Sequence, residues 1–275
     1  MWYKAGVNSR ISGGMIWRLA WWVGGSGVLA VRAGYNLVAP YPERWRRLGP
    51  HVSRWCRFAA RRLRIQVQCR GALPVQGSLV AANHQGYIDI LTIGGLFPTV
   101  FAARHDMRSW PVLGHLATWG GTIFINRDNR RAGARGVAVL TRALQAQSTV
   151  LVFPEGTGTD GTGVLPLRTG VFQAALDAGA PVVPAGVRYL SVDGEPVTAA
   201  NHHTVGWYRG ESFLQHLLRL GRYRCIEAAV EFGEALRPPH EDRRSLAERT
   251  EASLRNLLGL PPHARPVRSG RDDDP

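Results

Sequence analysis

From residue 64 onward, short apolar segments alternate with segments of helical periodicity, and no other feature of this chain constrains its fold as strongly. The predicted strands cover residues 64–69, 78–82, 100–103, 122–125, 150–153, 182–187 and 226–232. The clearest predicted helices cover residues 130–147, 171–178 and 242–258. Helices between strands favour parallel pairing, because a parallel crossover needs roughly a dozen residues or more. The sequence therefore predicts an α/β fold with a largely parallel mixed sheet flanked by helices.

The first 63 residues depart from this alternation and are predicted to associate with a membrane. Residues 15–40 are apolar and rich in tryptophan, but only thirteen uncharged residues separate Arg18 from Arg32. A helix that crosses the hydrocarbon core takes about 20 residues. The sequence therefore favours a helix that lies in one leaflet or dips into it, with its tryptophans at the headgroup level. A single membrane span and a hairpin buried in the protein core remain alternatives.

Residues 44–64 follow as a predicted basic amphipathic helix. This segment carries eight arginines and no acidic residue, with apolar side chains at helical spacing. Its arginines can dock on anionic lipid headgroups, and its apolar stripe can pack on the protein; both interpretations can hold together. The predicted organisation is a membrane-association region over 1–63, an α/β domain over 64–260 and a disordered tail over 261–275.

The formal charge of +14 favours anionic partners: a lipid surface, nucleic acid or a phosphorylated substrate. Lys4 is the only lysine among the 34 basic residues. A phosphate-binding loop that ends in Gly-Lys-Ser/Thr and a Schiff-base lysine are therefore excluded beyond position 4. Cys56, Cys69 and Cys225 lack metal-ligand spacing, so no metal site and no disulfide framework are predicted. A reducing compartment fits this cysteine usage best.

A histidine and an aspartate five residues apart, His84 and Asp89, follow the predicted buried strand at 78–82. Imidazole titrates near neutrality, and a carboxylate on one ring nitrogen lets the other nitrogen remove a proton from a weak hydroxyl nucleophile. On one continuous helix a five-residue step rotates the side chain by roughly 500°, which would place the two residues on different faces. His84 is therefore predicted to precede the helix that carries Asp89, with Gly86 at the strand-to-helix turn.

Two later strands end in polar residues, and a third contains a proline. Arg127 comes just after the strand at 122–125, where a guanidinium can hold a phosphate with two hydrogen bonds. After the strand at 150–153, Glu155 can neutralise or orient a partner, and Gly156 lets a ligand approach the backbone. Pro184 interrupts the strand at 182–187, which indicates an edge position or a position that lines a tunnel.

In order, spacing and identity, four blocks of this sequence resemble those of the glycerolipid acyltransferases, the family of the 1-acylglycerol-3-phosphate acyltransferases. The blocks are His-x4-Asp at 84–89, Gly-Thr-Ile-Phe-Ile-Asn-Arg at 121–127, Phe-Pro-Glu-Gly-Thr at 153–157 and Val-Pro-Ala at 183–185. The resemblance implies transfer of a fatty acyl group from a thioester to the free hydroxyl of a lysophospholipid. Acyl-CoA or acyl-carrier protein would be the co-substrate, and no cofactor is expected.

The resemblance also assigns roles in catalysis. His84 would deprotonate the acceptor hydroxyl, while Asp89 would hold the imidazole tautomer and stabilise the imidazolium. No acyl-enzyme is needed. Asn83, or a backbone N–H near Gly86, would donate a hydrogen bond to the oxyanion of the intermediate.

For the acceptor headgroup the resemblance implies a phosphate held by Arg127. Three residues would line the same pocket, namely Glu155, Gly156 and Thr157. Many relatives continue this block with an arginine, whereas this chain has Gly158, and Arg168 is expected to compensate. The expected acceptor is 1-acylglycerol-3-phosphate, which would give phosphatidic acid. The change at Gly158 leaves a lyso-ornithine lipid or another lysolipid as alternatives.

Two other classes of protein compete with an acyltransferase. A nonenzymatic lipid-binding protein at the membrane surface would need no base with an orienting carboxylate. A nucleic-acid-binding protein is disfavoured, because the basic helix adjoins an apolar segment and no nucleic-acid module is visible. The expected location is the membrane, at the cytoplasmic face of the inner (plasma) membrane.

Two further pairs of polar residues are expected to have no catalytic role. His105 and Asp106 lack the additional ligands of a metal site and are expected to be exposed or near the entrance for the acyl donor. His202 and His203 precede an aromatic stretch and are expected to be a solvated pair.

Overall fold

The structure is a computed structural model that describes residues 42–126, 129–208, 210–239 and 242–262. The apolar segment at 15–40, Arg127 and the tail beyond 262 lie outside the described residues. Within the described ranges, no helix is both long enough and apolar enough to cross a membrane.

The described part of the chain forms one sheet of eight strands. The strands are β1 (Ile65–Arg70), β2 (Leu79–Ala82), β3 (Val100–Arg104), β4 (Ile123–Ile125), β5 (Val150–Val152), β6 (Val182–Val192), β7 (Glu195–Pro196) and β8 (Ile226–Phe232). Their order is β1-β8-β6-β2-β5-β3-β4, and β7 pairs with β6 outside this path. Strands β6, β2, β5, β3 and β4 run parallel, whereas β8 pairs antiparallel with β6. The predicted largely parallel mixed sheet is confirmed.

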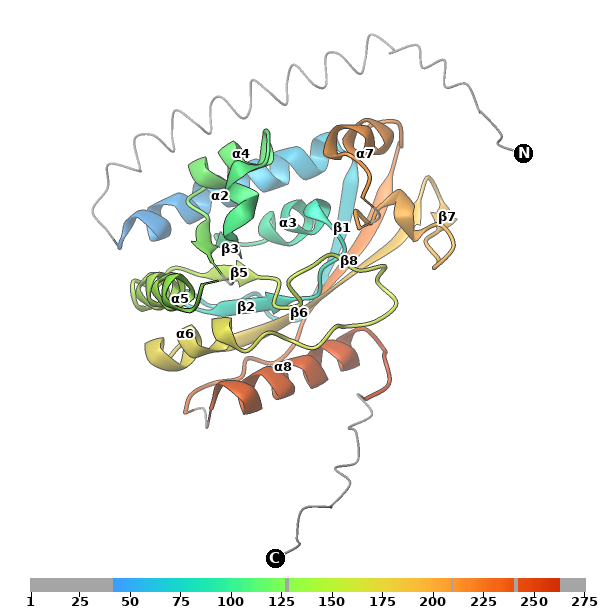
Figure 1. Cartoon of the computed structure of the whole chain (residues 1–275). Helices are drawn as coiled ribbons and strands as arrows, with labels where there is room; N and C mark the ends of the chain where they lie inside the picture. Colours follow the sequence, from blue (N-terminus) through green and yellow to red (C-terminus); the bar gives the residue numbers. More distant parts are fainter. Residues whose placement is uncertain (1–41, 127–128, 209, 240–241, 263–275) are drawn as a thin grey trace, which may run out of the picture.

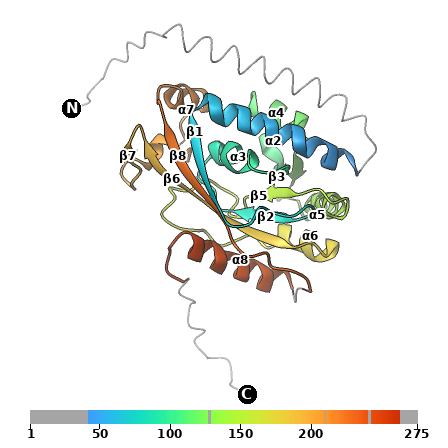
Figure 2. The same cartoon turned by 180° about the vertical axis from the view of Figure 1, so that it is seen from behind.

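Helices cover both faces of this sheet (Figures 1 and 2). They are α2 (Arg44–Arg62), α3 (Tyr87–Gly94), α4 (Leu113–Trp119), α5 (Arg130–Gln145), α6 (Gly170–Ala178), α7 (Phe213–Leu220) and α8 (Arg243–Leu257), with short 3-10 helices η1 (His105–Ser109) and η2 (His202–Thr204). Side chains alternate along β2, so Val80 packs with α2, α3 and α7, while Leu79 packs with α5, α6 and α8. Two apolar cores therefore enclose the central strands.

The basic helix α2 is part of the α/β domain. Its apolar stripe is buried, including Val52 and Cys56, and packs in the same core as α3. The indole Nε1 of Trp45 donates to the backbone oxygen of Gly121 at 3.0 Å. Most arginines of α2 are exposed. The stripe thus packs on the domain, which begins no later than α2, and docking of the arginines on lipid remains a prediction.

Pro184 lies at neither of its two expected positions. It is buried in β6, which has β2 on one side and β8 on the other, and it does not line the cavity described below. Proline is tolerated here because β8 ends at Phe232, beside Ala185. The next residue, Gly233, donates to the carbonyl oxygen of Pro184, and regular pairing with β6 has stopped.

Candidate active site

The turn between β2 and α3 brings His84 and Asp89 together, as their spacing predicts. Nδ1 of His84 lies 2.9 Å from Oδ2 of Asp89, which stands in the first turn of α3. Gly86 ends the turn under the segment that carries Trp207. A Cβ atom at position 86 would come within 2.9 Å of the backbone nitrogen of Trp207. Close approach of two backbones therefore explains the glycine.

Asp89 is fully buried and only accepts hydrogen bonds. Its Oδ2 receives the backbone N–H groups of Gln85 at 2.6 Å and Gly86 at 2.9 Å, and its Oδ1 receives the hydroxyl of Tyr189 at 2.7 Å. Burial raises the pKa of Tyr189, so this hydroxyl remains a donor. Because the carboxylate has no proton to give, Nδ1 of His84 must carry one. Nε2 is then the basic nitrogen of the ring, and it makes no hydrogen bond within the described part of the chain.

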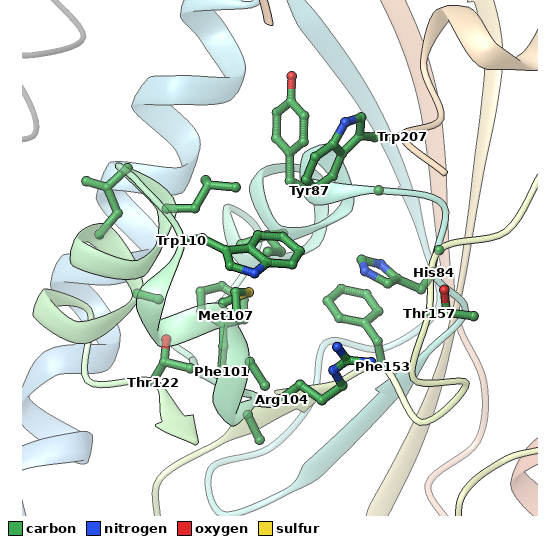
Figure 3. A pocket seen from close by; sticks show the side chains of 18 of the residues that line it. His84, Tyr87, Phe101, Arg104, Met107, Trp110, Thr122, Phe153, Thr157 and Trp207 are labelled. Atoms are coloured by element: carbon green, nitrogen blue, oxygen red, sulfur yellow. The ribbon is translucent and has the colours of Figure 1, made fainter. Parts of the chain in front are cut away.

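A cavity of about 440 Å³ opens beside His84. Its wall is mostly apolar and comes from α2, α3, β3, η1, α4 and the segment around Trp207. Figure 3 places His84 and Thr157 on one side and Thr122 on the opposite side, with Trp110 and Met107 between them. Apolar pockets of this size with a few polar groups are typical of small-molecule sites.

The ring of Phe153 holds the His84 imidazole against one side of this cavity. The two rings stack with their centroids 4.1 Å apart and their planes inclined by 22°. The His84 side chain keeps 21% of its surface exposed, whereas the Asp89 side chain keeps none. The base therefore faces the cavity from a position fixed by a stacked ring and a buried carboxylate.

Glu155 lies behind the site instead of lining it. Its Oε1 accepts the backbone N–H of His84 and its Oε2 accepts that of Leu165, both at 2.8 Å. Burial raises the pKa of Glu155 to about 7, and the two backbone hydrogen bonds oppose that shift. The carboxyl group joins the His84 turn to the loop that follows β5, which differs from the expected contact with substrate.

Two of the expected oxyanion donors, the side chain of Asn83 and the backbone N–H of Gly86, already bind other groups of the protein. The side-chain amide of Asn83 donates to the backbone oxygen of Val187 at 3.0 Å, and its Oδ1 accepts the backbone N–H of Val187 at 2.8 Å. The backbone N–H of Gly86 is bound to Asp89. Asn83 thus fastens the end of β2 to β6 and does not line the cavity.

The next two residues of the third block belong to the cavity wall. Gly156 and Thr157 line the cavity beside His84, and Gly156 has a φ of 81°, in the left-handed region that favours glycine. Gly158 lines it too. Arg168 is exposed and absent from the cavity wall, so the structure gives no support for its compensating role.

The two pairs of polar residues that the sequence places outside the catalytic centre lie in different environments. Asp106 lines the cavity and pairs with Arg104, and the described ranges hold no cluster of three His, Cys, Asp or Glu side chains suited to a metal. His202 is buried, contrary to the expected solvated pair, because its Nε2 lies 2.6 Å from Oε1 of Gln85. This contact fastens the segment before Trp207 to the His84 turn.

Comparison with known proteins identifies the family. A family model described as Acyltransferase matches residues 64–188. The 1-acyl-sn-glycerol-3-phosphate acyltransferase of Neisseria meningitidis is 34% identical over 186 residues, which are 66% of this chain and 69% of that protein. The chain belongs to the acyltransferase family. It is therefore an acyl-transferring enzyme, and His84 and Asp89 fall within the matched region.

One further relative and one solved structure extend this comparison. The lyso-ornithine lipid O-acyltransferase of Rhizobium meliloti is 31% identical over 227 residues, 79% of this chain and 76% of that enzyme. The crystal structure of the 1-acyl-sn-glycerophosphate acyltransferase PlsC from Thermotoga maritima superimposes with a TM-score of 0.60 at 18% identity. It covers 85% of this acyltransferase and 86% of that chain, so the two share a fold.

Proposed function

We propose that this acyltransferase moves a fatty acyl group from a thioester, acyl-CoA or acyl-carrier protein, to the free hydroxyl of a lysolipid. The observation that carries the proposal is the placement of His84. Its Nδ1 is held by the buried Asp89, while its Nε2 is unbonded within the described residues at the wall of an apolar cavity. Such an arrangement suits removal of a proton from a hydroxyl beside an acyl chain.

The reaction needs one base and no acyl-enzyme. Nε2 of His84 takes the hydroxyl proton while the hydroxyl oxygen attacks the thioester carbonyl carbon. The C–S bond of the tetrahedral intermediate then breaks, the ester forms, and the imidazolium returns the proton to the departing thiolate. Asp89 stabilises the imidazolium, and the stacked Phe153 keeps the ring from turning away.

The oxyanion of the intermediate is proposed to accept hydrogen bonds from backbone N–H groups at the end of the third block. The N–H groups of Thr157 and Gly158 make no hydrogen bond among the described residues, and both residues line the cavity beside His84. Backbone donors of this kind stabilise charge that develops during acyl transfer. We prefer them to Asn83, which does not line the cavity.

Two acceptors are candidates. The family resemblance favours 1-acylglycerol-3-phosphate, with its phosphate held by Arg127, and the Neisseria meningitidis relative is named for this substrate. The Rhizobium meliloti relative is named for lyso-ornithine lipid, and its similarity extends over 227 residues instead of 186. Both acceptors carry a hydroxyl next to an acyl chain, so the chemistry at His84 is the same for either.

We place the enzyme at an anionic membrane surface on the cytoplasmic face of the inner membrane. The exposed arginines of α2 and the net charge of +14 favour anionic lipid. Three large apolar side chains are also exposed on α4 and on the turn between η1 and α4, namely Trp110, Val112 and Trp119. Trp110 lines the cavity as well, so an apolar rim of the cavity would meet the lipid.

The test is a thioester-cleavage assay with the purified full chain in mixed vesicles. Acyl-CoA and acyl-carrier protein are supplied in turn with a panel of lysolipids, and the released thiol and the acylated lipid are both measured. The wild type should form product, and His84→Ala should lower kcat by about 100-fold or more. His115→Ala, an exposed histidine outside the cavity wall, is the matched control. Full activity of His84→Ala would refute the mechanism.

A further inference from the structure

The described wall of the cavity carries three charged side chains besides His84: Arg104, Asp106 and Glu211. Arg104 and Asp106 form a two-point ion pair. The Nε of Arg104 donates to Oδ1 of Asp106 at 2.8 Å, and its terminal nitrogen donates to Oδ2. Glu211 is paired with Arg219 at 2.7 Å. The described wall therefore presents one guanidinium and two carboxylates.

The Arg104–Asp106 pair lines the same cavity as His84 and is partly exposed. Arg104 ends β3, and Asp106 lies in η1. Arg104 lines the same cavity as Phe153, the ring that stacks on His84, and both are labelled in Figure 3. The Arg104 side chain is 55% exposed and the Asp106 side chain 34% exposed. Both side chains therefore keep exposed surface while they bind each other.

We propose that the Arg104–Asp106 pair is the headgroup site and that it selects a zwitterionic lysolipid, with an acceptor carboxylate on Arg104 and an acceptor ammonium on Asp106. This inference rests on the proposed acyl transfer to a lysolipid hydroxyl. An ornithine headgroup has this chemistry, because ornithine that is acylated on one amine keeps one ammonium and one carboxylate. Each charge of such a headgroup meets its opposite at the pair, and no charge is left uncompensated.

A phosphate monoester fits the pair less well. It would bring nearly two negative charges to Arg104, whose guanidinium is already bound to a carboxylate. The hydrogen bonds from Arg104 lower the pKa of Asp106, so that this carboxylate stays ionised at neutral pH. The charge of Asp106 therefore opposes binding of a phosphate at Arg104, and solvent weakens this repulsion because both side chains are partly exposed.

The experiment compares three acceptors with one acyl donor on the full chain in vesicles. They are lyso-ornithine lipid, the same lipid with its free amine acetylated, and 1-acylglycerol-3-phosphate. We expect the wild type to have the highest kcat/KM with lyso-ornithine lipid, and acetylation to lower that value about tenfold or more, since it removes a charge-assisted hydrogen bond. Asp106→Asn should lose most of this sensitivity to acetylation. Asp177→Asn, on α6 and outside the cavity wall, should keep it.

The possible results separate the headgroup site from the acyl transfer itself. Transfer to 1-acylglycerol-3-phosphate that exceeds transfer to lyso-ornithine lipid overturns the headgroup inference and leaves the proposed function intact. Equal sensitivity to acetylation in wild type and Asp106→Asn also overturns it. If Asp106→Asn does not fold, the wild-type response to acetylation decides alone. Absence of transfer to every lysolipid overturns the proposed function and the headgroup site with it.

Discussion

Replacement of Glu155 by glutamine tests how the turn that carries His84 is held. Both carboxyl oxygens of Glu155 accept a backbone N–H, one from His84 and one from Leu165. Glutamine keeps the shape of the side chain but supplies one acceptor oxygen only, so its NH2 group must face one of these two donors. The substitution also removes the ionisable group from a buried position.

The effect on stability depends on pH. Burial raises the pKa of Glu155 from its ordinary value of 4.5 to about 7. The folded protein therefore holds this proton at pH values where the unfolded chain has lost it. The resulting stabilisation is fully present below pH 4.5 and is lost as pH rises through 7. At about 1.4 kcal/mol per pKa unit, the loss amounts to about 3 kcal/mol in the free energy of unfolding.

Thermal unfolding of wild type and Glu155→Gln, followed by circular dichroism between pH 4 and pH 8, measures this loss. Near pH 4 both side chains are neutral and the two proteins should be of similar stability. By pH 8 the free energy of unfolding of the variant should exceed that of the wild type by about 3 kcal/mol. For a domain of this size, this difference raises Tm by about 6–12 °C. Glu234→Gln, at an exposed glutamate, controls for the loss of one charge. A Tm difference that is constant with pH, or shared by the control, would refute the reasoning.

Two substitutions test the catalytic pair and the cavity. Asp89→Asn removes the charge that stabilises the imidazolium, and we expect kcat to fall about 100-fold to 10⁴-fold with little change in KM; steady-state kinetics at saturating donor measure this, and a pure KM effect would contradict it. Ala117 lines the cavity on α4, so Ala117→Leu should reduce activity with long acyl chains more than with short ones. Activity measured with a series of acyl-CoA chain lengths tests this prediction. An equal loss of activity at every chain length would show that the acyl chain lies elsewhere.

Much of the fold follows from local sequence, because strong local signals agree with tertiary burial. The predicted helix at 130–147 is observed as α5, Arg130–Gln145, where Asn129 caps the first turn by accepting the N–H of Ala132 at 3.0 Å. The predicted strand at 226–232 is β8, whose buried and half-buried residues alternate. Where apolar period and cap agree, the element and its bounds could be predicted.

The elements that the sequence does not predict, or predicts too short, have a different physical origin. The helices α4 and α7 are only two turns long, too short for periodicity to identify them. The strand β6 continues five residues beyond the predicted 187, to Val192, because β8 pairs with its second half. That pairing depends on a strand more than thirty residues later in the chain, and no window around β6 contains it.

The same distinction separates the site residues. His84 and Asp89 could be predicted because one turn determines their contact. Glu155 and Asn83 could be singled out from the sequence, but their partners could not, since these are backbone groups of Leu165 and Val187 on other segments. A carboxylate or an amide next to a catalytic turn can bind a substrate or accept a hydrogen bond from a backbone N–H, and the sequence does not distinguish the two. In the fold these side chains accept hydrogen bonds from backbone N–H groups that would otherwise lack a partner.

Two carboxyl groups hold His84, and their different environments divide the task between them. Asp89 receives four donors and binds the imidazole ring, whereas Glu155 receives two and binds the backbone of the same residue. The pKa of Glu155 is raised by its burial and by the charge of Asp89, and it is lowered by His84. When His84 takes a proton during catalysis, its positive charge therefore favours ionised Glu155 just when the imidazolium needs a second negative charge nearby. This coupling exists only while the hydroxyl proton resides on His84, so loss of Glu155 should lower kcat and leave KM for the lysolipid nearly unchanged.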